Sequence, residues 1–378
     1  MLLTNEQEMI RDTARAFAQK EIAPNTHAWE RDHVVPTHIL SQLGALGLMG
    51  ICVAEEWGGA NADFVSYILA TEELAAADCG ICNMMNVHNS PVCAALQEYG
   101  TEAQKEGLLR PLAQGKMFGA LLLTEPDAGS DAAAIKTRAV RRGDRYILNG
   151  TKQFVTSGRT AHVAMILAVT DPSKGSKGIS CFITRTDNPG YKVSRVEDKL
   201  GHRNCDTCQI VLEDMEVPAD DVLGEPGGGY KIILAFLTAG RIAVAAQAVG
   251  VARAALECSI AYARERKTFG KALAEHQSIA FRLADMATQI TVARQMLHHV
   301  AQEKDAGRIV PAEASMIKLF ASEMAEKVCS EAIQIHGGYG YLSEFPVEKY
   351  YRDARVLQIY EGSSEVQRIL ISRQLLKG

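Results

Sequence analysis

Glu361 is the residue of this chain that could act as a general base. It stands in the run Glu361-Gly362-Ser363-Ser364-Glu365, where serines that can cap a helix follow a carboxylate and a glycine. A carboxylate at such a point can take a proton near neutral pH if burial raises its pKa. Taken alone, the same residue also fits a solvated acid at the start of a helix, favoured by the helix dipole.

Two segments nearer the middle of the chain combine residue types that suit a bound ring or anion. Leu123–Asp131 follows an expected strand and brings hydroxyl and glycine residues together, so backbone N–H groups can approach an anion or a planar carbonyl. In Gly150–Gly158, Phe154 stands two residues before Thr156, so its ring could stack on a planar ligand while the hydroxyl reaches the ligand's edge. Each segment alone also fits a plain turn or a core aromatic.

Two more segments lie in the last third of the chain. Gln334–Tyr341 carries three glycines after an Ala-rich stretch, which permits close backbone approach to a ligand and also fits a helix C-cap. Arg264–Gly270, followed by His276 and Gln277, lies at a break between two helical patterns. The elements around these segments decide whether they can form one site.

The order of the expected elements divides the chain into three parts. Residues 1–117 have helical patterns, with Thr4 as the cap of the first helix; β-rich runs occupy 118–224, and long helical patterns fill 225–378. A doubly wound sheet is excluded, because it needs strands that alternate with helices throughout. We expect an α+β multidomain protein with an N-terminal helical domain, a central β-sandwich or barrel and a C-terminal helical bundle.

The individual elements are predicted from hydrophobic periodicity and turn residues. Strands are expected at 120–123, 146–148, 154–156, 163–169, 179–184 and 208–212. Helices are expected at 37–48, 63–77, 89–114, 243–263 and 276–303.

Composition and charge narrow the class of protein. The chain of 378 residues is 47% hydrophobic, has a net charge of −5 and carries no basic tail, which argues against a nucleic-acid partner. No run approaches the roughly 20 apolar residues that span a bilayer. Residues 1–8 fit neither a secretory signal nor a transit peptide. We therefore expect a cytoplasmic protein without a membrane partner.

The cysteines do not indicate a disulfide scaffold. Nine cysteines, an odd number in a chain of this length, fit reduced thiols. The CxxC pairs Cys79/Cys82 and Cys205/Cys208 leave a four-thiolate zinc site open, but they are far apart in sequence and no paired histidine accompanies them. We expect no metal.

In this order and at this spacing, the five segments resemble the acyl-CoA dehydrogenase family. The resemblance covers nearly the whole chain, and Thr124–Asp131 and Gln334–Asp353 are highly specific matches. It implies an N-terminal helical domain, a central β-domain and a C-terminal four-helix bundle, with FAD between the last two. It also implies an acyl-CoA substrate, an electron-transfer flavoprotein as acceptor and a homo-oligomer, usually a tetramer built as a dimer of dimers.

The resemblance also assigns binding residues. The residues expected at the chain's own FAD are Leu121, Thr124, Ser130, Phe154, Thr156, Ser363 and Glu365. The residues expected to reach the FAD of a neighbouring subunit are Arg266, Thr268, Phe269, Gln277, Gln334, Gly337 and Gly338. The residues that match acyl-CoA contacts are Ser130, Arg241, Gly362 and Arg373.

Two positions depart from the family pattern. The flavin-stacking position is often Trp and is Phe154 here, which keeps the stacking with less area. An acid often stands three residues before the CoA-contacting arginine, and here that residue is Thr238. An expected contact to the CoA arm is therefore missing.

The resemblance implies one catalytic base. Some branches of the family carry it on the bundle helix beside the CoA-contacting arginine, but the neighbour of Arg241 is Gly240, which cannot act as a base, so Glu361 is expected to do so. The implied reaction is the α,β-dehydrogenation of an acyl-CoA thioester to the trans-2-enoyl-CoA. Glu361 takes the α-proton and flavin N5 the β-hydride, while the backbone N–H of Glu361 and a ribityl hydroxyl stabilise the enolate.

Several alternatives stay open. The acyl chain length is unsettled, because short-chain and medium-chain features both occur. An enoyl-CoA reductase, an acyl-CoA oxidase or a desulfinase could use the same scaffold. A non-catalytic flavin-binding protein would need a missing base or a basic extra domain, whereas Glu361 is present.

Overall fold

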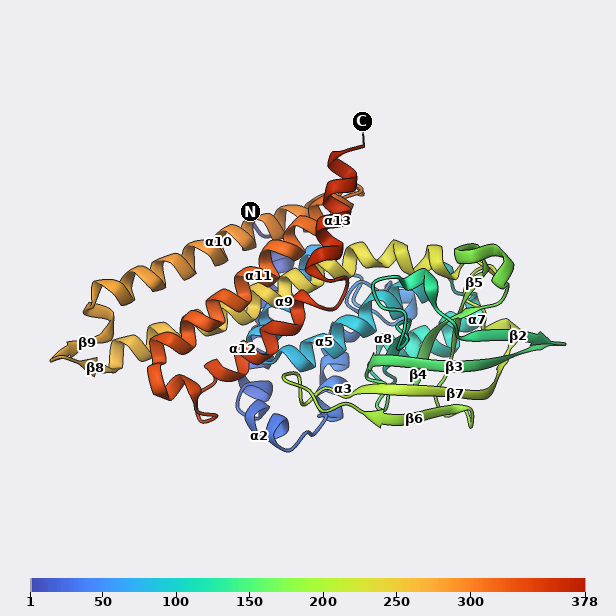
Figure 1. The fold of residues 1–378 in the computed structure, drawn as a ribbon, viewed down its shortest axis with the longest axis horizontal. Helices are drawn as coiled ribbons and strands as arrows, with labels where there is room; N and C mark the ends of the chain where they lie inside the picture. Colours follow the sequence, from blue (N-terminus) through green and yellow to red (C-terminus); the bar gives the residue numbers. More distant parts are fainter. Residues whose placement is uncertain (1, 378) are drawn as a thin grey trace.

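The computed structural model describes residues 2–377, and its elements follow the order helices, strands, helices (Figure 1). Helical structure gives way to strands between Ala113 and Gly119, and strands to helices between Pro218 and Gly229. The predicted fold class is confirmed, whereas domain boundaries at residues 117 and 224 remain predictions.

The N-terminal domain is built of short helices. They are α1 Asn5–Phe17, η1 Ala18–Ile22, α2 Thr26–Arg31, α3 Thr37–Ala45, η2 Leu48–Gly50, η3 Glu55–Trp57, α4 Phe64–Ala77, α5 Cys79–Val87, η4 His88–Cys93, α6 Ala94–Tyr99, α7 Glu102–Gln104, η5 Lys105–Leu109 and α8 Arg110–Ala113. Thr4 caps α1 as predicted: its side chain accepts from the Gln7 N–H in a capping box. No helix was predicted at α5, although Asp78 caps it by accepting from the Ile81 N–H.

The β-domain forms one connected sheet. Its elements are β1 Gly119–Leu122, η6 Ala132–Ala134, β2 Arg138–Arg142, β3 Arg145–Thr156, β4 Val163–Val169, η7 Pro172–Gly178, β5 Ile179–Arg185, β6 Tyr191–Val196, β7 Thr207–Pro218 and η8 Ala219–Asp221. The strand order is β1-β4-β2-β3-β7-β6, with β5 paired to β4. The two short strands predicted at 146–148 and 154–156 are parts of one strand, β3. Strands β2 and β6 were not predicted, because both are mostly exposed and rich in charged or polar residues.

Strand β4 explains how the sheet is held. Alternate residues face two different cores: Val163 and Met165 pack in one, Ala164 and Ile166 in the other. Because both faces are covered, β4 is a continuous apolar run rather than an alternating pattern. The first of these cores also contains N-terminal helices and the start of the next long helix, so the sheet packs against both helical parts.

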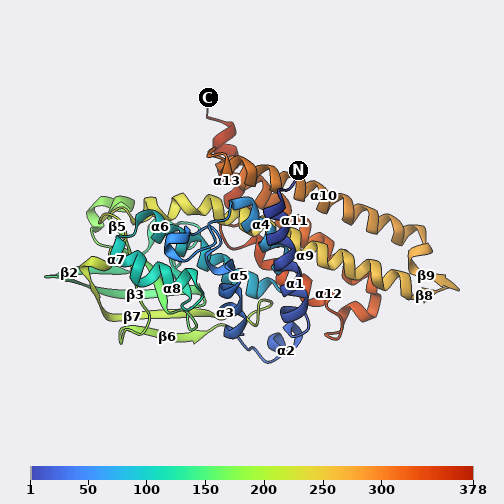
Figure 2. The ribbon, with the colours of Figure 1, turned by 180° about the vertical axis from the view of Figure 1, so that it is seen from behind.

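The C-terminal domain contains three long helices. Its elements are α9 Gly229–Glu265, β8 Lys267–Thr268, β9 Lys271–Ala272, η9 Leu273–Glu275, α10 Gln277–Asp305, α11 Pro311–His336, η10 Gly337–Tyr341, α12 Val347–Arg355, η11 Val356–Gln358 and α13 Ser364–Leu375. One apolar core joins Leu74 of α4, Val249 of α9 and Ala325 of α11. Seen from behind, α1 and α4 lie over the bundle beside α9 (Figure 2).

Helix α9 corrects one expectation from the sequence. It is long and apolar enough to cross a membrane by length and composition, although no such stretch was predicted. However, 72% of its most apolar window is buried inside the protein. This burial is what a core helix of a globular fold shows, so its apolar character is accounted for by packing.

A buried charge cluster joins the three domains. Lys349 of α12 lies 3.2 Å from Asp78 of the N-terminal domain and also pairs with Asp353. From the β-domain, the His202 N–H donates to Asp353 at 2.7 Å and the Asn204 amide donates to Asp78 at 2.8 Å. Because each buried charge has a partner, the cluster fixes how the domains meet.

Candidate active site

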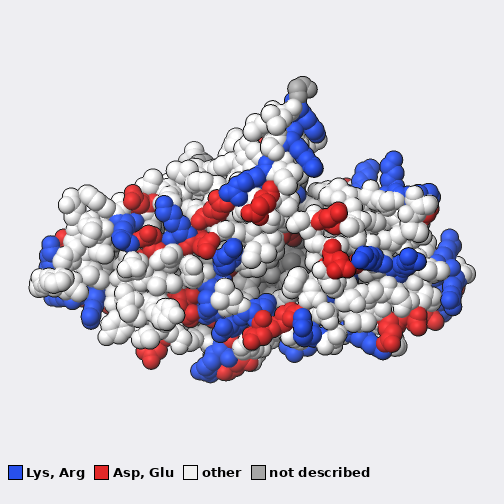
Figure 3. Space-filling model, in the orientation of Figure 1, with Lys and Arg blue, Asp and Glu red and all other residues white. Residues whose placement is uncertain are grey.

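The carboxylate of Glu361 lies directly against helix α9. A Cβ atom built on Gly240 would lie 2.8 Å from Glu361 Oε2, so no side chain separates the helix from the carboxylate. Figure 3 shows a hollow in this face of the molecule, near its middle and beneath the start of α13. The space that a side chain at position 240 would take is thus occupied by the carboxylate of Glu361.

The backbone around Glu361 is sharply turned. Glu361 has a φ of 53° and Gly362 a φ of 87°, both in the left-handed region. This conformation is costly for a residue other than glycine and persists only where the surroundings hold it. The Gly362 carbonyl accepts from Lys318 Nζ at 2.7 Å and from Gln367 Nε2 at 2.8 Å. Ser363 then caps α13 by accepting from the Val366 N–H.

Burial and two positive charges act on this carboxylate in opposite directions. Burial raises the pKa of Glu361, while the positive charges of Arg241 and Lys318 oppose that rise. Arg241 is 9% exposed, burial lowers its pKa, and its Nε has no hydrogen-bond partner within residues 2–377. Burial lowers the pKa of Lys318 to about 8, against the effect of Glu361. The site is therefore a poorly solvated carboxylate facing two cations.

Helix α5 links the carboxylate to the sheet. Tyr360, next to Glu361, donates from its hydroxyl to Gln247 of α9 at 2.9 Å. Gln247 in turn donates to the Cys79 carbonyl at the start of α5. In the middle of this short helix, Asn83 donates to the Thr156 hydroxyl at 3.4 Å. Thr156, at the end of β3, is thus placed on the same side of the fold as Glu361.

Phe154 points out of the sheet. The register of β3 against β7 slips between Lys152 and Val155, and Phe154 takes a φ of 57° in this bulge. As a result its ring is 65% exposed, which makes the interpretation of Phe154 as a core aromatic wrong. The preceding Gln153 N–H donates to the Thr124 carbonyl at 2.8 Å, so the bulge lies beside the Thr124 loop.

A buried ion pair that the sequence analysis missed holds this loop. Lys152 is fully buried and its Nζ lies 2.8 Å from Glu125 and 3.1 Å from the Leu123 carbonyl. Glu125 also accepts from the Lys136 and Thr137 backbone N–H groups. No clear local signal marked this pair, because Lys152 lies among polar residues within β3 and Glu125 lies in the loop after β1. Leu121 lies in β1 at the start of the same loop, and Ser130 is exposed near its end.

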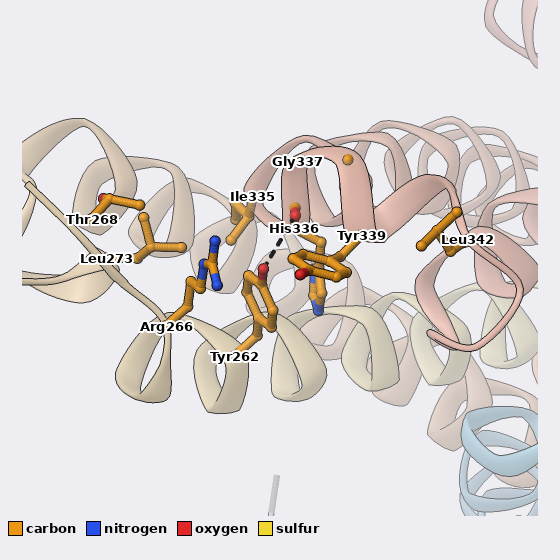
Figure 4. Close-up of a pocket in the computed structure, with 10 residues that line it drawn as sticks. Tyr262, Arg266, Thr268, Leu273, Ile335, His336, Gly337, Tyr339 and Leu342 are labelled. Atoms are coloured by element: carbon orange, nitrogen blue, oxygen red, sulfur yellow. Dashed lines mark hydrogen bonds between the residues drawn. The ribbon is translucent and has the colours of Figure 1, made fainter.

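A second group of predicted residues gathers at the far end of the bundle. A cavity of about 390 Å³ is lined by Arg266, Thr268, Gly337 and Gly338, with Tyr339 and others (Figure 4). The Arg266 guanidinium lies 5.4 Å from the centre of the Tyr339 ring. Four further predicted residues are exposed: Phe269, which is 98% exposed, with Gln277 and Gln334 on α10 and α11, and Arg373 on α13.

The two groups cannot meet on one ligand within one chain. Gly240, beside Glu361, and Arg266, just past the end of α9, lie about 39 Å apart along the helix at 1.5 Å per residue. Figure 1 shows β8 and β9 at the end of the molecule opposite the sheet. The two groups of predicted residues are therefore separate places in one chain.

The cysteine pairs do not form a metal site in the structure. All nine cysteines are free thiols. Among residues 2–377, no group of three or more His, Cys, Asp or Glu side chains could hold a metal ion.

Known proteins and protein families match this chain over nearly its whole length. Residues 4–116, 120–215 and 227–376 match the N-terminal, middle and C-terminal domains of acyl-CoA dehydrogenases. The short-chain specific acyl-CoA dehydrogenase of Clostridium acetobutylicum is 42% identical over 376 residues, 99% of each chain. Acryloyl-CoA reductase (NADH) of Anaerotignum propionicum is 41% identical over 377 residues, covering 99% of this chain and 95% of its own.

Solved structures of similar proteins share the fold of the whole chain. Butyryl-CoA dehydrogenase from Megasphaera elsdenii superposes with a TM-score of 0.97 at 41% identity, covering 100% of both chains. A structure described as the electron transferring flavoprotein of Acidaminococcus fermentans, in relation to flavin-based electron bifurcation, gives a TM-score of 0.98 at 43% identity, again over 100% of both chains. With its three domain matches and these relatives, the chain belongs to the acyl-CoA dehydrogenase family, FAD-dependent oxidoreductases that act on CH–CH bonds.

Proposed function

We propose that this protein oxidises an acyl-CoA thioester to the trans-2-enoyl-CoA, with Glu361 as the base that removes the α-proton. The observation that carries the proposal is the Glu361 carboxylate, which lies against Gly240 of α9 and whose pKa is raised by burial. A general base works best when its pKa lies near the working pH, because it must be ionised and still hold the proton firmly. FAD, when bound, supplies the acceptor for the β-hydride.

The backbone N–H of Glu361 is the proposed donor to the thioester oxygen. It donates to no acceptor within residues 2–377, and Glu361 lies in the bend between η11 and α13. Loss of an α-proton places negative charge on the thioester oxygen, and a fixed N–H donor stabilises that charge. Arg241, Gly362, Ser130 and Arg373 are the proposed contacts of the acyl-CoA; Arg241 supports this with its unpartnered Nε.

The residues present fit an FAD. Exposed Phe154 offers an aromatic face, Thr156 and Thr124 offer hydroxyl and backbone groups beside it, and Ser363 stands at the start of α13. We assign Leu121, Ser130 and Glu365 to the same cofactor. These residues would hold the flavin ring next to Glu361.

The far half-site fits a cofactor carried by another copy of the chain. Its members are Arg266, Thr268, Phe269, Gln277, Gln334, Gly337 and Gly338, which lie too far from Glu361 to serve the same chain's cofactor. The planar guanidinium of Arg266 suits a pyrophosphate, because it donates several hydrogen bonds in a fixed fork. We therefore propose a homo-oligomer, with a tetramer as the expected form.

The direction of the reaction and its electron partner are also part of the proposal. We propose an electron-transfer flavoprotein as acceptor and the cytoplasm as location; the flavoprotein named for one similar structure and the bacterial sources of the relatives support them. Reduction of an enoyl-CoA is the second candidate, favoured by the acryloyl-CoA reductase relative. A dye-coupled assay with and without oxygen separates a dehydrogenase from an oxidase.

Anaerobic titration of the holoprotein with a panel of acyl-CoA thioesters tests the function. Bleaching of the flavin by one member identifies both the reaction and the acyl length. Glu361→Gln should keep its FAD and lose nearly all bleaching, because the amide cannot accept the α-proton. Glu56→Gln is the matched control, because Glu56 is an exposed acid of the N-terminal domain; the flavin of this variant should be bleached as in the wild type. Full activity of Glu361→Gln with butyryl-CoA or octanoyl-CoA would contradict the assignment.

A further inference from the structure

Lys318 is a buried cation to which the mechanism above gives no task. It lies in the first third of α11, where its side chain is fully buried, on a helix whose other buried residues are mostly small or apolar. A buried ammonium is unfavourable unless hydrogen bonds and opposite charge offset the loss of water. Its surroundings should therefore show what this charge stabilises.

The hydrogen bond of Lys318 goes to the base segment. Its Nζ donates to the Gly362 carbonyl at 2.7 Å, directly after Glu361. Gln367 of α13 donates to the same carbonyl at 2.8 Å and to the Glu361 carbonyl at 3.2 Å. A carbonyl oxygen has two lone pairs, and both are engaged here. The left-handed turn is thus tied to α11 on one side and to α13 on the other.

The charge of Lys318 is not neutralised by a direct partner. Within residues 2–377 it forms no salt bridge of 4.0 Å or less, whereas the other buried lysines, Lys152 and Lys349, each pair with a carboxylate. The charged groups that act on it are Glu361, Arg241 of α9, Glu365 of α13 and Glu323 of α11. Glu361 itself faces Arg241 and Lys318. The positive charge of Lys318 is therefore available to the base.

We propose that Lys318 is a positioning residue for the base: it fixes the Gly362 carbonyl, which aims the Glu361 carboxylate, and its ammonium stabilises the ionised carboxylate. This inference rests on the proposed function, because it concerns the base of that reaction. The Lys318 side chain combines a hydrogen bond to the Gly362 carbonyl with a positive charge, and substitutions can separate the two effects. Gln367 makes a similar hydrogen bond to the same carbonyl but carries no charge.

The pair Lys318→Met and Gln367→Met separates the anchor from the charge. Both substitutions remove a donor to the Gly362 carbonyl and leave an unbranched apolar side chain, but only the first removes a charge. The measurement is anaerobic flavin reduction by butyryl-CoA in rapid-mixing experiments on the holoenzyme. The second-order rate constant, followed across pH, reports the ionisations of the free enzyme.

Different pH profiles are expected for the two variants. In Lys318→Met, the rate constant falls and the acidic midpoint moves up by on the order of one pH unit, because an opposite charge near the carboxylate is lost. An alkaline limb present near pH 8, the value to which burial lowers the pKa of Lys318, disappears. In Gln367→Met, the rate constant falls at every pH and both midpoints stay in place.

Three results would overturn the proposal. The first is an unchanged acidic midpoint in Lys318→Met, and the second is an equal midpoint shift in both variants. The third concerns folding: if Lys318→Met yields no holoenzyme, the double variant Lys318→Met/Glu361→Gln should fold, because it removes both charges. Failure of both proteins to fold would reduce Lys318 to a structural role. If the wild-type flavin is bleached by no acyl-CoA, the proposed function has failed instead.

Discussion

Replacing Gly240 by alanine tests the position of the base with a single methyl group. The new Cβ would lie 2.8 Å from Glu361 Oε2 and 3.2 Å from its Cδ, whereas ordinary contacts begin near 3.4 Å. The carboxylate is the far end of a flexible side chain, so it would retreat by about 0.6 Å while the helix stays in place. The change thus moves the base and little else.

The expected result is a slower reaction in an intact protein. A misplacement of about 1 Å can cost roughly 100-fold in rate, so a retreat of about 0.6 Å should lower flavin reduction roughly tenfold. Stability should not fall, because alanine is favoured over glycine inside a helix by about 1 kcal/mol. Thermal unfolding, FAD content and rapid-mixing reduction by the best acyl-CoA of the panel measure the three quantities.

A double variant checks that the methyl group acts through Glu361. Glu361→Asp shortens the side chain and draws the carboxylate away from position 240. Gly240→Ala should then cost almost nothing further, so the two effects are not additive. Wild-type reduction rates in Gly240→Ala, or full additivity in the double variant, would refute the placement of the carboxylate against α9.

Two further predictions concern the cofactor and pH. Arg266→Ala should lose FAD on gel filtration while keeping its fold, whereas Arg264→Ala, exposed two residues earlier on α9, should retain it; equal retention would contradict the inter-subunit role. Burial lowers the pKa of His88 to about 4, so the unfolded state binds more protons as pH falls below about 6.5 and stability is lost. The free energy of unfolding should drop by about 2 kcal/mol from this residue between pH 7 and pH 5. Denaturant titrations should show this part of the pH dependence missing in His88→Gln.

The neutral form of His88 is needed for packing between two domains. Its Nδ1 accepts from the Gly119 N–H at 3.1 Å, and its Nε2 lies 3.2 Å from the Leu112 carbonyl. Protonation would place a second N–H against the Gly119 donor. The acid sensitivity therefore follows from a junction between η4 and β1 rather than from the active site.

Local patterns predicted the elements that bury an apolar face. Strand β4 was predicted at the residues where it occurs, and α10 within two residues, because their apolar residues recur at a regular spacing. Strands β2 and β6 and helix α5 were not predicted. The two strands are held by pairing with the strand that follows each of them, and α5 by burial, rather than by an apolar pattern of their own.

The candidate site shows the same division. Glu361 and the residues of the far group could be predicted as site residues because their motifs are local in sequence, and their roles remain predictions. Lys318 and the Lys152–Glu125 pair were not predicted, because each acts on a partner far away in the chain. Gln367 was missed although its partner Gly362 is only five residues away, because no local pattern marks this hydrogen bond. Nothing within a few residues of Lys318 reveals that its partner is Gly362.

The sequence by itself determined which chemical groups are present and the order of the three domains. Residue types and short motifs carry that information, since helix caps, turns and hydrophobic periodicity depend on neighbours in the chain. Tertiary structure alone decided that the Glu361 carboxylate rests on Gly240, that two cations face it, and that the two groups of predicted residues lie about 39 Å apart along α9. Burial and electrostatic interaction depend on distances in space, and only the packed fold sets those distances.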